Sequence, residues 1–391
     1  MFDYFEVLVV TGPRQVGKTT ILKEMMPDNM KMVSLDDESL RAEAKINPRL
    51  FLQTFGKPLF IAEIQYAPEL FSYIKMEVDN DNSRGQYWLS GSQTFELLKN
   101  VTESLAGRVG IIKMNSLTYK EINNSVNNIV FDPDNLKKSN NINVNELFET
   151  IYNGGMPELC SIKNMDRNMF FASYVNTYIE KDVRKLINVG NIETFNEFMR
   201  VLVIRNGKTL NYSDIAKDVE VSSNTIKEWV SVLVSSRIIY LLEPYHNKKI
   251  ERLTHLPKIV FMDSGLCSFL AGFTSARELQ LSSDSGNYLE TYIVSEIIKS
   301  YDNNSISLDI THFRNKEIEE IDLIITKNSK VYPLEIKKTA NPNRTMLKSF
   351  KYLEKANVKL GTGGLISIYE ELIPLDDKNY YIPISSVINN K

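Results

Sequence analysis

The segment TGPRQVGKTT, residues Thr11–Thr20, decides the fold of the N-terminal part of the chain. It contains the pattern G-x-x-x-x-G-K-T, preceded by the apolar run Val7–Val10 and followed by the helix-forming letters ILKEMM. Strand, glycine loop and helix are the context that a phosphate-binding loop requires. Gly12 and Gly17 let the backbone curl so that successive N–H groups point at one phosphate. The positive N-terminal end of the following helix favours the same anion. The pattern predicts nucleotide binding; the alternative is a chance match in a glycine-containing turn.

Two side chains of this segment have specific expected roles. The Lys18 amine reaches the β- and γ-phosphates, and the Thr19 hydroxyl binds the accompanying Mg²⁺. The residues expected to surround the phosphates are Gly12, Pro13, Arg14, Gln15, Val16, Gly17, Lys18, Thr19 and Thr20.

The composition predicts a cytoplasmic globular protein of two or three domains. The chain has 391 residues, of which 43% are hydrophobic and 24% charged. The formal net charge of −3 gives no overall electrostatic case for nucleic acid, so any such contact needs a local patch. Cys160 and Cys267 lie far apart, which argues against a disulfide framework and suits a reducing cytosol. His246, His255 and His312 are scattered, which argues against a histidine-based metal site.

No targeting or membrane segment is expected. The N-terminus lacks the basic start and long apolar core of a signal peptide. No apolar run approaches the roughly 18–20 residues that span a bilayer.

Strands and helices alternate along the first 125 residues, which predicts a doubly wound parallel sheet. Candidate strands are Lys31–Asp37, Pro58–Gln65 and Gly85–Gln93. The carboxyl ends of such strands face the ligand crevice. Glu63 at the end of the second strand is therefore expected near Mg²⁺ and the attacking water. Ser90 belongs to the Ser-Gly-Ser segment (residues 90–92) at the end of the third strand, and it is expected near the γ-phosphate.

The motifs TGPRQVGKTT, VSLDD, PLFIAEIQYAPEL, LSGSQ, SLAGRV and SLTYKEI occur in this order. Together they resemble the AAA+ ATPase domain of a widespread prokaryotic family, whose members carry a C-terminal domain of unknown function 4143. The resemblance covers nearly the whole chain. It implies that Lys18 and Thr19 bind ATP and Mg²⁺, that Glu63 activates water, that Ser90 senses the γ-phosphate, and that Arg108 is an arginine finger or sensor. The alternatives are a solvated acid at Glu63 and a helix-end salt bridge at Arg108.

The sequence departs from the family pattern at two places. The family has Asp-Glu where this chain has Ala62-Glu63, and a methyl group cannot support Mg²⁺. Hydrolysis is therefore expected to be slow, unless Asp36 or Asp37 substitutes. The family also has a helix and linker ahead of the first strand, which this sequence lacks.

The region after the ATPase domain is expected to contain a linker and a helical connector. The Asn-rich stretch NNSVNNIVFDPDNLKKSNNINVNE predicts a loop at the domain boundary. In the helix Met169–Ile187, Phe170 and Tyr174 belong to an aromatic stripe, which is typical of core packing. The KDVR step at residues 181–184 resembles a family motif in the same place.

A helix-turn-helix pattern follows, within a predicted winged helix over residues 191–272. Ser213 is a candidate cap of the first helix, Ser223–Ser235 is the second helix, and RIIYLLEPY is a wing strand. A DNA-binding interpretation places Ser222, Ser223, Asn224 and Lys227 against DNA. A structural or protein-binding role is the alternative, because the face is weakly basic. Asp263 is expected to cap a further helix.

The C-terminal part resembles a PD-(D/E)xK restriction-endonuclease-like core. Its helix Gly286–Tyr301 carries an acid, and two later strands carry an aspartate and an E-x-K step. Such a set can hold Mg²⁺ and stabilise a pentavalent phosphate. The matching residues are Glu290, Asp322, Glu335 and Lys337, with Asp322 and Glu335 as candidate metal ligands. The alternative is a buried ion-pair cluster without cleavage.

The predicted fold class is α/β. The expected domains are an AAA+ ATPase domain (1–125), a linker and connector (126–190), a winged helix (191–272) and a nuclease-like module (280–391). Three functional hypotheses remain open: an ATP-dependent switch acting on DNA or a protein partner, a metal-dependent DNA nuclease regulated by ATP, and a non-hydrolysing nucleotide-binding scaffold. A homo-oligomer is possible in each case, since the arginine of one AAA+ subunit commonly completes its neighbour's site.

Overall fold

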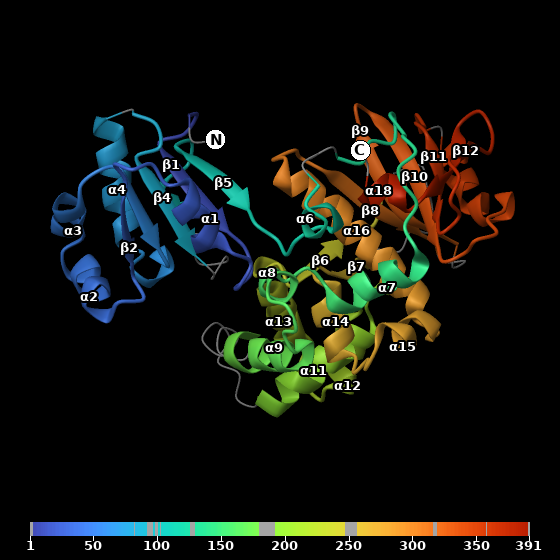
Figure 1. Ribbon diagram of the computed structural model, residues 1–391, viewed down its shortest axis with the longest axis horizontal. Coiled ribbons are helices and arrows are strands. Elements are labelled where there is room, and N and C mark those ends of the chain that lie inside the picture. Colours follow the sequence, from blue (N-terminus) through green and yellow to red (C-terminus); the bar gives the residue numbers. More distant parts are fainter. Residues whose placement is uncertain are drawn as a thin grey trace. The chain divides into compact units, whose positions relative to one another are not determined.

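The computed structural model divides the chain into two compact units (Figure 1). One comprises Met1–Asn115 with Ser235–Arg237, and the other Ser116–Val234 with Ile238–Lys391. The structure describes residues 3–81, 83–91, 97, 101, 103–125, 130–179, 192–246, 256–315, 319–356 and 358–389. Ser92, the KDVR step, Ile187 and His255, which the sequence singled out, lie outside these ranges.

The first unit is built on a five-stranded sheet in the order β2-β3-β4-β1-β5, with every neighbouring pair parallel. The predicted parallel sheet is thereby confirmed. Its strands are β1 (Val7–Thr11), β2 (Lys31–Ser34), β3 (Leu59–Ala62), β4 (Tyr87–Gly91) and β5 (Val109–Lys113). Its helices are α1 (Lys18–Met25), α2 (Glu38–Ile46), α3 (Pro48–Phe55), the short 3₁₀ helix η1 (Ile64–Tyr66) and α4 (Leu70–Asn80).

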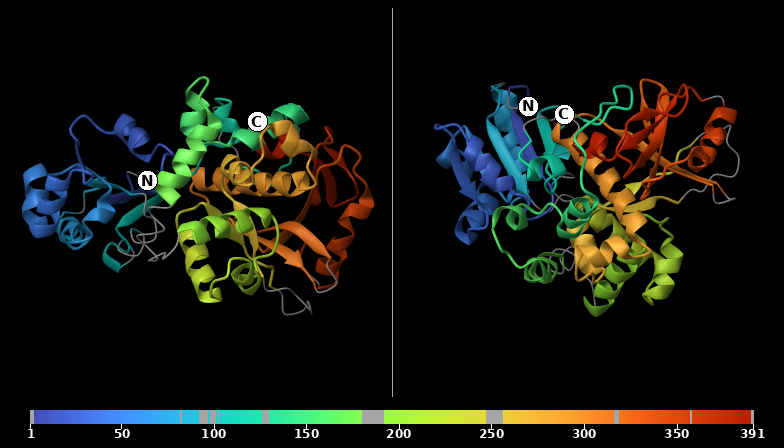
Figure 2. Two further views of the ribbon diagram at one scale, coloured as in Figure 1. Left: turned by 90° about the horizontal axis from the view of Figure 1, so that it is seen from below. Right: turned by 45° about the vertical axis from the view of Figure 1, so that its right-hand side comes forward.

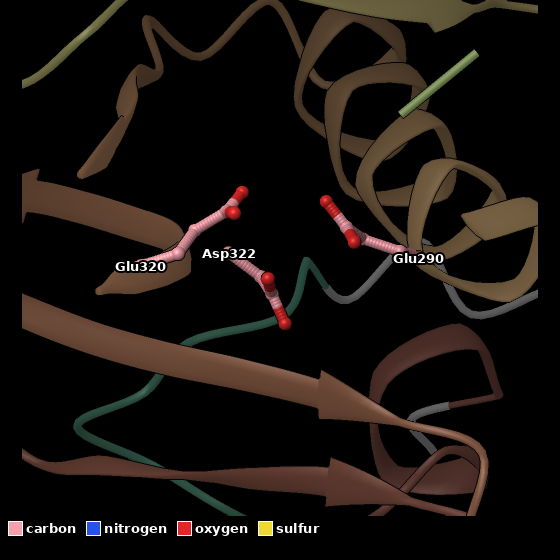
Figure 3. A group of neighbouring side chains, drawn as sticks. All are labelled: Glu290, Glu320 and Asp322. Atoms are coloured by element: carbon pink, nitrogen blue, oxygen red, sulfur yellow. The ribbon is translucent and has the colours of Figure 1, made fainter. Parts of the chain in front are cut away.

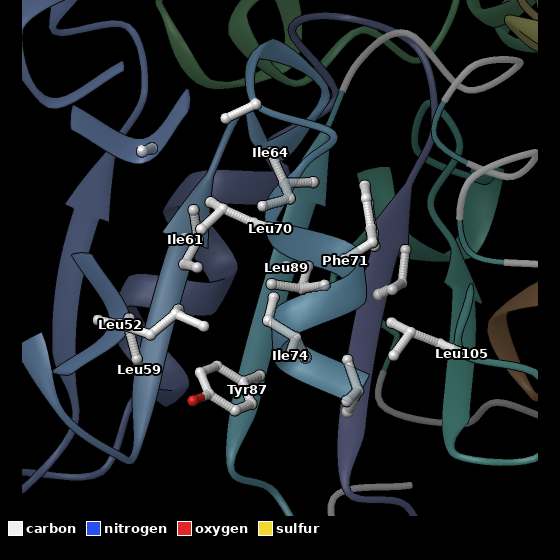
Figure 4. Packing of buried hydrophobic residues seen from close by; sticks show 14 of the residues in the cluster. Leu52, Leu59, Ile61, Ile64, Leu70, Phe71, Ile74, Tyr87, Leu89 and Leu105 are labelled. Carbon is white, nitrogen blue, oxygen red and sulfur yellow. The ribbon is translucent and has the colours of Figure 1, made fainter. Parts of the chain in front are cut away.

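Side chains of β1 alternate between two hydrophobic clusters, which shows that both faces of this sheet are covered. Val7 and Val9 belong to one cluster with Phe71 of α4. Figure 4 shows part of this cluster, with Phe71 labelled. Leu8 and Val10 pack in the other cluster with Leu22 of α1. The first helix and α4 therefore cover opposite faces, and the loop between β1 and α1 lies at the carboxyl edge of the sheet.

The second unit begins with helices and one hairpin. The helices are α6 (Tyr119–Ile122), α7 (Val144–Asn153), α8 (Pro157–Ser161), α9 (Arg167–Tyr174), the π-helical η2 (Val175–Ile179), α11 (Ile192–Ile204), α12 (Tyr212–Asp218), α13 (Ser223–Ser235), α14 (Ser264–Leu270) and α15 (Ala276–Leu281). Strands β6 (Ile239–Leu242) and β7 (Lys258–Phe261) pair antiparallel. Phe170 and Tyr174 are buried, as the aromatic stripe predicted.

Two predicted helix caps have different outcomes. Asp263 caps α14 as predicted, because its carboxylate accepts a hydrogen bond from Leu266 N at 2.9 Å. The expected cap at Ser213 is wrong. Asn211 caps α12 instead, since its side-chain oxygen accepts from the backbone N–H groups of Ser213 and Asp214. The helix begins at Tyr212, so Ser213 lies inside its first turn.

The second unit ends in a mixed sheet beside the long helix α16 (Ser285–Asn303), which packs against β7 and β10. The strand order is β12-β13-β11-β10-β9-β8. Figure 2 shows this orange-to-red part from two further sides. Strands β8 to β10 form an antiparallel meander, whereas β11 is parallel to both β10 and β13. The elements are β8 (Asp309–Arg314), β9 (Glu320–Lys327), β10 (Lys330–Lys337), η3 (Arg344–Phe350), α17 (Lys351–Lys355), β11 (Gly363–Ser367), β12 (Ile373–Pro374), β13 (Asn379–Pro383) and α18 (Ser385–Ile388).

Candidate functional site

The loop between β1 and α1 has the backbone of an anion cradle. Gly12, Gln15 and Gly17 have φ angles of 148°, 60° and 86°, which turn the chain sharply before the helix starts. A Cβ atom on Gly12 would lie 2.1 Å from the carbonyl oxygen of Met114, so only glycine fits there. Gly17 is the N-cap of α1. The sequence therefore places glycine where this loop has no room or no allowed φ for another residue.

Lys18 lies inside this loop. Its side chain is 6% exposed, and Nζ donates hydrogen bonds to the carbonyl oxygens of Gly12 at 2.9 Å and Pro13 at 2.6 Å. Thr19, next to it in the first turn of α1, is half-buried. The amine is thus held at the mouth of the loop by neutral acceptors, which a phosphate oxygen can replace.

Glu63 and Ser90 come to the same edge of the sheet. Ser90 is fully buried in β4, directly beside Val10 of β1, and its hydroxyl has no hydrogen-bond partner among the described residues. Glu63 follows β3 in a left-handed conformation (φ 55°, ψ 42°) and accepts a hydrogen bond from Gln65 Nε2 at 2.5 Å. Neighbouring strands lie about 4.8 Å apart. Ser90 is therefore one strand away from β1, which leads into the loop, and Glu63 is two strands away.

Ala62 is buried in an apolar environment. Its methyl group, 2% exposed, belongs to a cluster that includes Leu22, Phe60 and Trp88. This position stands opposite Ser90 in the register of β3 and β4. The residue that the family uses to support Mg²⁺ is therefore replaced here by a packing contact.

Neither candidate substitute for the missing acid lies near the loop. Asp36 and Asp37 follow β2, which is separated from β1 by two strands and is therefore roughly 14 Å away across the sheet. The Asp37 carboxylate also caps α2 by accepting from the N–H groups of Ser39 and Leu40. Asp36 accepts from the hydroxyl of Ser34.

Arg108 lies at the opposite edge of the sheet from the phosphate loop. It immediately precedes β5, whereas the loop follows β1, and the two strands run parallel. Its guanidinium forms an ion pair with Asp79 and donates to Ala106 O at 3.0 Å. Arg108 therefore does not face the loop of its own chain, and a sensor role in that loop does not fit its position.

The four nuclease-like residues of the second unit come together. Lys337 Nζ lies 3.0 Å from Asp322 Oδ2 and 2.6 Å from Glu335 Oε1. Asp322 also accepts a hydrogen bond from Ile336 N at 2.9 Å, just beyond the last paired residues of β9 and β10. Glu290 projects from α16 toward this group.

Two residues that the sequence did not single out complete the cluster. Lys258 Nζ lies 2.6 Å from Glu290 Oε1 and 3.7 Å from Asp322 Oδ1, and it also forms an ion pair with Glu320. Figure 3 shows Glu290, Glu320 and Asp322 converging from α16 and β9. One carboxylate oxygen from each lies within 4.8 Å of the others, which would suit a metal ion. Glu320 was detectable, because strand alternation puts it on the same face as Asp322; Lys258 had only the weak signal of a lysine that begins an apolar strand.

Burial and charge determine the protonation of this cluster. Burial, together with the charge of Asp322, raises the pKa of both Glu290 and Glu335 above the usual range. Burial also opposes ionisation of Asp322, but Lys258 and Lys337 outweigh it and hold its pKa below the usual value. Burial disfavours the charged form of Lys258, yet the surrounding carboxylates, Glu290 foremost, raise its pKa. Lys258 is thus a protonated, buried cation.

The strand order and the phosphate loop define the first unit as a P-loop domain of the AAA+ class. Residues 4–123 match a family described as an AAA domain, and residues 285–387 match a domain of unknown function, DUF4143. Residues 144–277 match another domain of unknown function, DUF8612. The chain therefore carries an AAA domain followed by a DUF4143 domain, as the sequence motifs predicted. Membership of the AAA class implies nucleotide binding, usually with Mg²⁺.

Two relatives align with nearly the whole length of this chain. Uncharacterized proteins of Mycobacterium tuberculosis and Mycobacterium bovis are each 23% identical over 386 residues, covering 98% of this chain and 81% of theirs. Among solved structures, the RuvB Holliday junction branch migration motor of Thermotoga maritima has 17% identity and a TM-score of 0.28, covering 61% of this chain and 82% of its own. Protein VC1899 from Vibrio cholerae has 14% identity and a TM-score of 0.21, covering 99% and 96%.

Within the described ranges, the helices are all too short or too polar to cross a membrane.

Proposed function

We propose that this protein is an ATP-binding AAA+ switch that acts on DNA or on a protein partner through its second unit. The observation that carries the proposal is the phosphate loop. Its glycine-dependent backbone and the Lys18 amine held at its mouth form a cradle for the β- and γ-phosphates of ATP. The Thr19 hydroxyl would hold the accompanying Mg²⁺.

Slow hydrolysis suits a switch better than a motor. Glu63 would orient the attacking water, and the Ser90 hydroxyl, which has no hydrogen-bond partner among the described residues, would contact the γ-phosphate. Mg²⁺, however, would lack the strand-end carboxylate that Ala62 replaces. Arg108, which faces away from its own loop, is suited to complete the site of a neighbouring subunit in a homo-oligomer, at the expense of its pair with Asp79.

The arrangement of α12, α13 and the β6–β7 hairpin supports a winged helix over residues 191–272, following a connector (126–190) and the ATPase domain (1–125). Three of the four candidate DNA-contacting residues are exposed: Ser222, Asn224 and Lys227, whereas Ser223 is half-buried. Glu228 is exposed beside them. This mixed charge supports a protein partner as well as DNA.

A metal-dependent nuclease, with ATP in a regulatory role, is the second candidate. It is favoured by the convergence of Glu290, Asp322, Glu335 and Lys337 within the module at residues 280–391. Helix α16, the antiparallel meander β8–β10 and the parallel strand β11 also fit the PD-(D/E)xK arrangement. A non-hydrolysing scaffold is the third candidate, favoured by Ala62.

Calorimetric titration of the full chain with ATP and Mg²⁺ tests the proposal. Wild type is expected to bind one ATP per chain. Lys18→Ala should weaken binding at least about a hundredfold, because two charge-assisted hydrogen bonds of about 1.5 kcal/mol or more each are lost. Lys23→Ala, which removes an exposed lysine from the same helix, is the matched control and should bind normally.

Retention of wild-type affinity by Lys18→Ala would disprove the phosphate-loop assignment. A paired assay of ATP turnover and DNA cleavage, with and without DNA, together with target binding measured in ATP and in ADP, separates the three candidates. A switch should bind its DNA or protein target differently with ATP and with ADP; a nuclease should cut; a scaffold should do neither.

A further inference from the structure

The carboxylate cluster of the second unit contains a cation that the chain itself supplies. The Lys258 side chain is 2% exposed, and its ammonium forms ion pairs with Glu290, Glu320 and Asp322. These are the same three carboxylates whose oxygens lie close enough together to hold a metal ion. The ammonium therefore lies where their negative charges converge.

A divalent ion and this ammonium cannot share these oxygens. Mg²⁺ binds oxygen at about 2.0–2.1 Å and Ca²⁺ at about 2.3–2.6 Å. The Lys258 nitrogen is already 2.6 Å from Glu290 Oε1, so a metal bound to that oxygen would lie against a buried positive charge. The residues present do not fit a resident metal ion while Lys258 is in place.

We propose that Lys258 is a built-in cation that excludes divalent metal from the nuclease-like site of the folded protein. The site can take a metal only when the ammonium leaves it. This inference goes beyond the nucleotide switch and does not depend on ATP binding; it restricts the nuclease alternative.

Lys258 belongs to the β6–β7 hairpin, so the position of this hairpin determines whether the ammonium lies in the cluster. Lys258 is the first residue of β7, which pairs with β6. The chain just beyond β6 pairs in turn with β8, because Tyr245 N donates to His312 O and His312 N donates to Glu243 O. These two hydrogen bonds hold the hairpin beside the sheet that carries Glu320 and Asp322, and a bound partner that displaced β7 from this sheet would draw the ammonium out of the cluster. Glu335 could also bind a metal ion that enters the cluster, since its buried Oε2 atom has no hydrogen-bond partner among the described residues.

Manganese binding to the nucleotide-free full chain tests the proposal. Mn²⁺ is titrated by calorimetry and by electron paramagnetic resonance into wild type, Glu290→Gln and Lys258→Met. Methionine keeps the length of the lysine stem without its charge. Wild type and Glu290→Gln should bind Mn²⁺ alike. Lys258→Met should bind one additional Mn²⁺ per chain, with an affinity at least about tenfold higher than any Mn²⁺ binding by wild type. The double variant Lys258→Met with Glu290→Gln should not bind this additional ion.

Lys299→Met is the matched control. Lys299 is another buried lysine of the same unit, paired with Glu296 at 3.5 Å but outside the cluster. Its loss should create no Mn²⁺ site, even if it destabilises the protein. If Lys258→Met does not fold, the variant Lys258→Met with Glu320→Gln reduces the remaining repulsion and should still gain the site through Glu290 and Asp322.

Two results would overturn the proposal. One is a wild-type Mn²⁺ site that Glu290→Gln removes, because the ammonium would then not exclude metal; this result needs no lysine variant. The other is a folded Lys258→Met protein, shown by its near-ultraviolet circular dichroism, that binds no additional Mn²⁺.

Discussion

Placing an acid at position 62 is expected to raise the rate of ATP hydrolysis. In Ala62→Asp, the carboxylate would stand at the end of β3 and opposite Ser90, where it could support the Mg²⁺ of bound ATP. A gain of only about 1.4 kcal/mol in transition-state stabilisation corresponds to a tenfold rise in kcat. We expect at least about this rise, because metal support contributes several kcal/mol in such sites.

The same substitution should destabilise the nucleotide-free protein. Ala62 is 2% exposed beside Leu22 and Trp88, so the new side chain overpacks the cluster at a cost of about 1–3 kcal/mol. Burial also raises the pKa of the new carboxyl group. At neutral pH, each unit of this rise in pKa lowers the free energy of unfolding by about 1.4 kcal/mol. A total of about 2–4 kcal/mol would lower the Tm of the first unit by roughly 8–16 °C. Mg²⁺ and ATP should restore more stability to this variant than to wild type.

Phosphate release at saturating ATP and Mg²⁺, together with thermal unfolding, measures both effects. Ala62→Asn is the control, since it adds the same volume without the charge. It should lose the packing stability and gain no turnover. Equal turnover by the Asp and Asn variants, with a measurable wild-type rate, would show that another group serves the metal. A wild-type kcat already in the ordinary enzyme range, about 1 s⁻¹ or more, would also refute the reasoning.

Two further predictions concern the second unit. Asp263→Ala should lower the free energy of unfolding by roughly 3–5 kcal/mol, because the carboxylate accepts from Leu266 N at 2.9 Å and Gly155 N at 3.0 Å. Urea denaturation measures this, and Asp263→Asn should lose less; a loss below about 1 kcal/mol would contradict it. Burial lowers the pKa of His312 to about 3, so the unfolded chain takes up a proton near pH 6.5 that the folded chain refuses. Stability should therefore fall from about pH 6.5 toward pH 3, by about 2 kcal/mol at pH 5, and His312→Gln should flatten this dependence.

The sequence predicted the features that depend on neighbouring residues. The glycines of the phosphate loop, the alternation of strands and helices, and the cap at Asp263 are each encoded within a few residues. The grouping of Asp322, Glu335 and Lys337 was also predictable, because alternation fixes the face of a strand on which a side chain lies. The wrong cap at Ser213 arose because two good capping residues, Asn211 and Ser213, lie two positions apart and sequence alone does not rank them decisively.

Other features depend on contacts between distant segments. Lys258 meets a carboxylate that lies 32 residues away in the sequence, and no periodicity in KIVF indicates that its first side chain points into the protein. Arg108 lies at the opposite end of the strands from the phosphate loop because it precedes β5, which runs parallel to β1; the motif resemblance alone did not place it there. The position of Asp36 likewise follows from β2 being an edge strand.

Both candidate sites hold a lysine where a ligand is expected, but a ligand would have to displace different partners in each. Lys18 donates to two neutral carbonyl groups, so exchanging them for phosphate oxygens strengthens its hydrogen bonds. Lys258 is held by carboxylates, and removing one member of a buried ion pair leaves the other charges uncompensated. Nucleotide binding therefore includes an exchange of these carbonyl groups for phosphate oxygens within the loop. On the proposal made above, metal binding at the carboxylate cluster needs the Lys258 ammonium to leave three carboxylates, and displacement of the strand that carries Lys258 would achieve this.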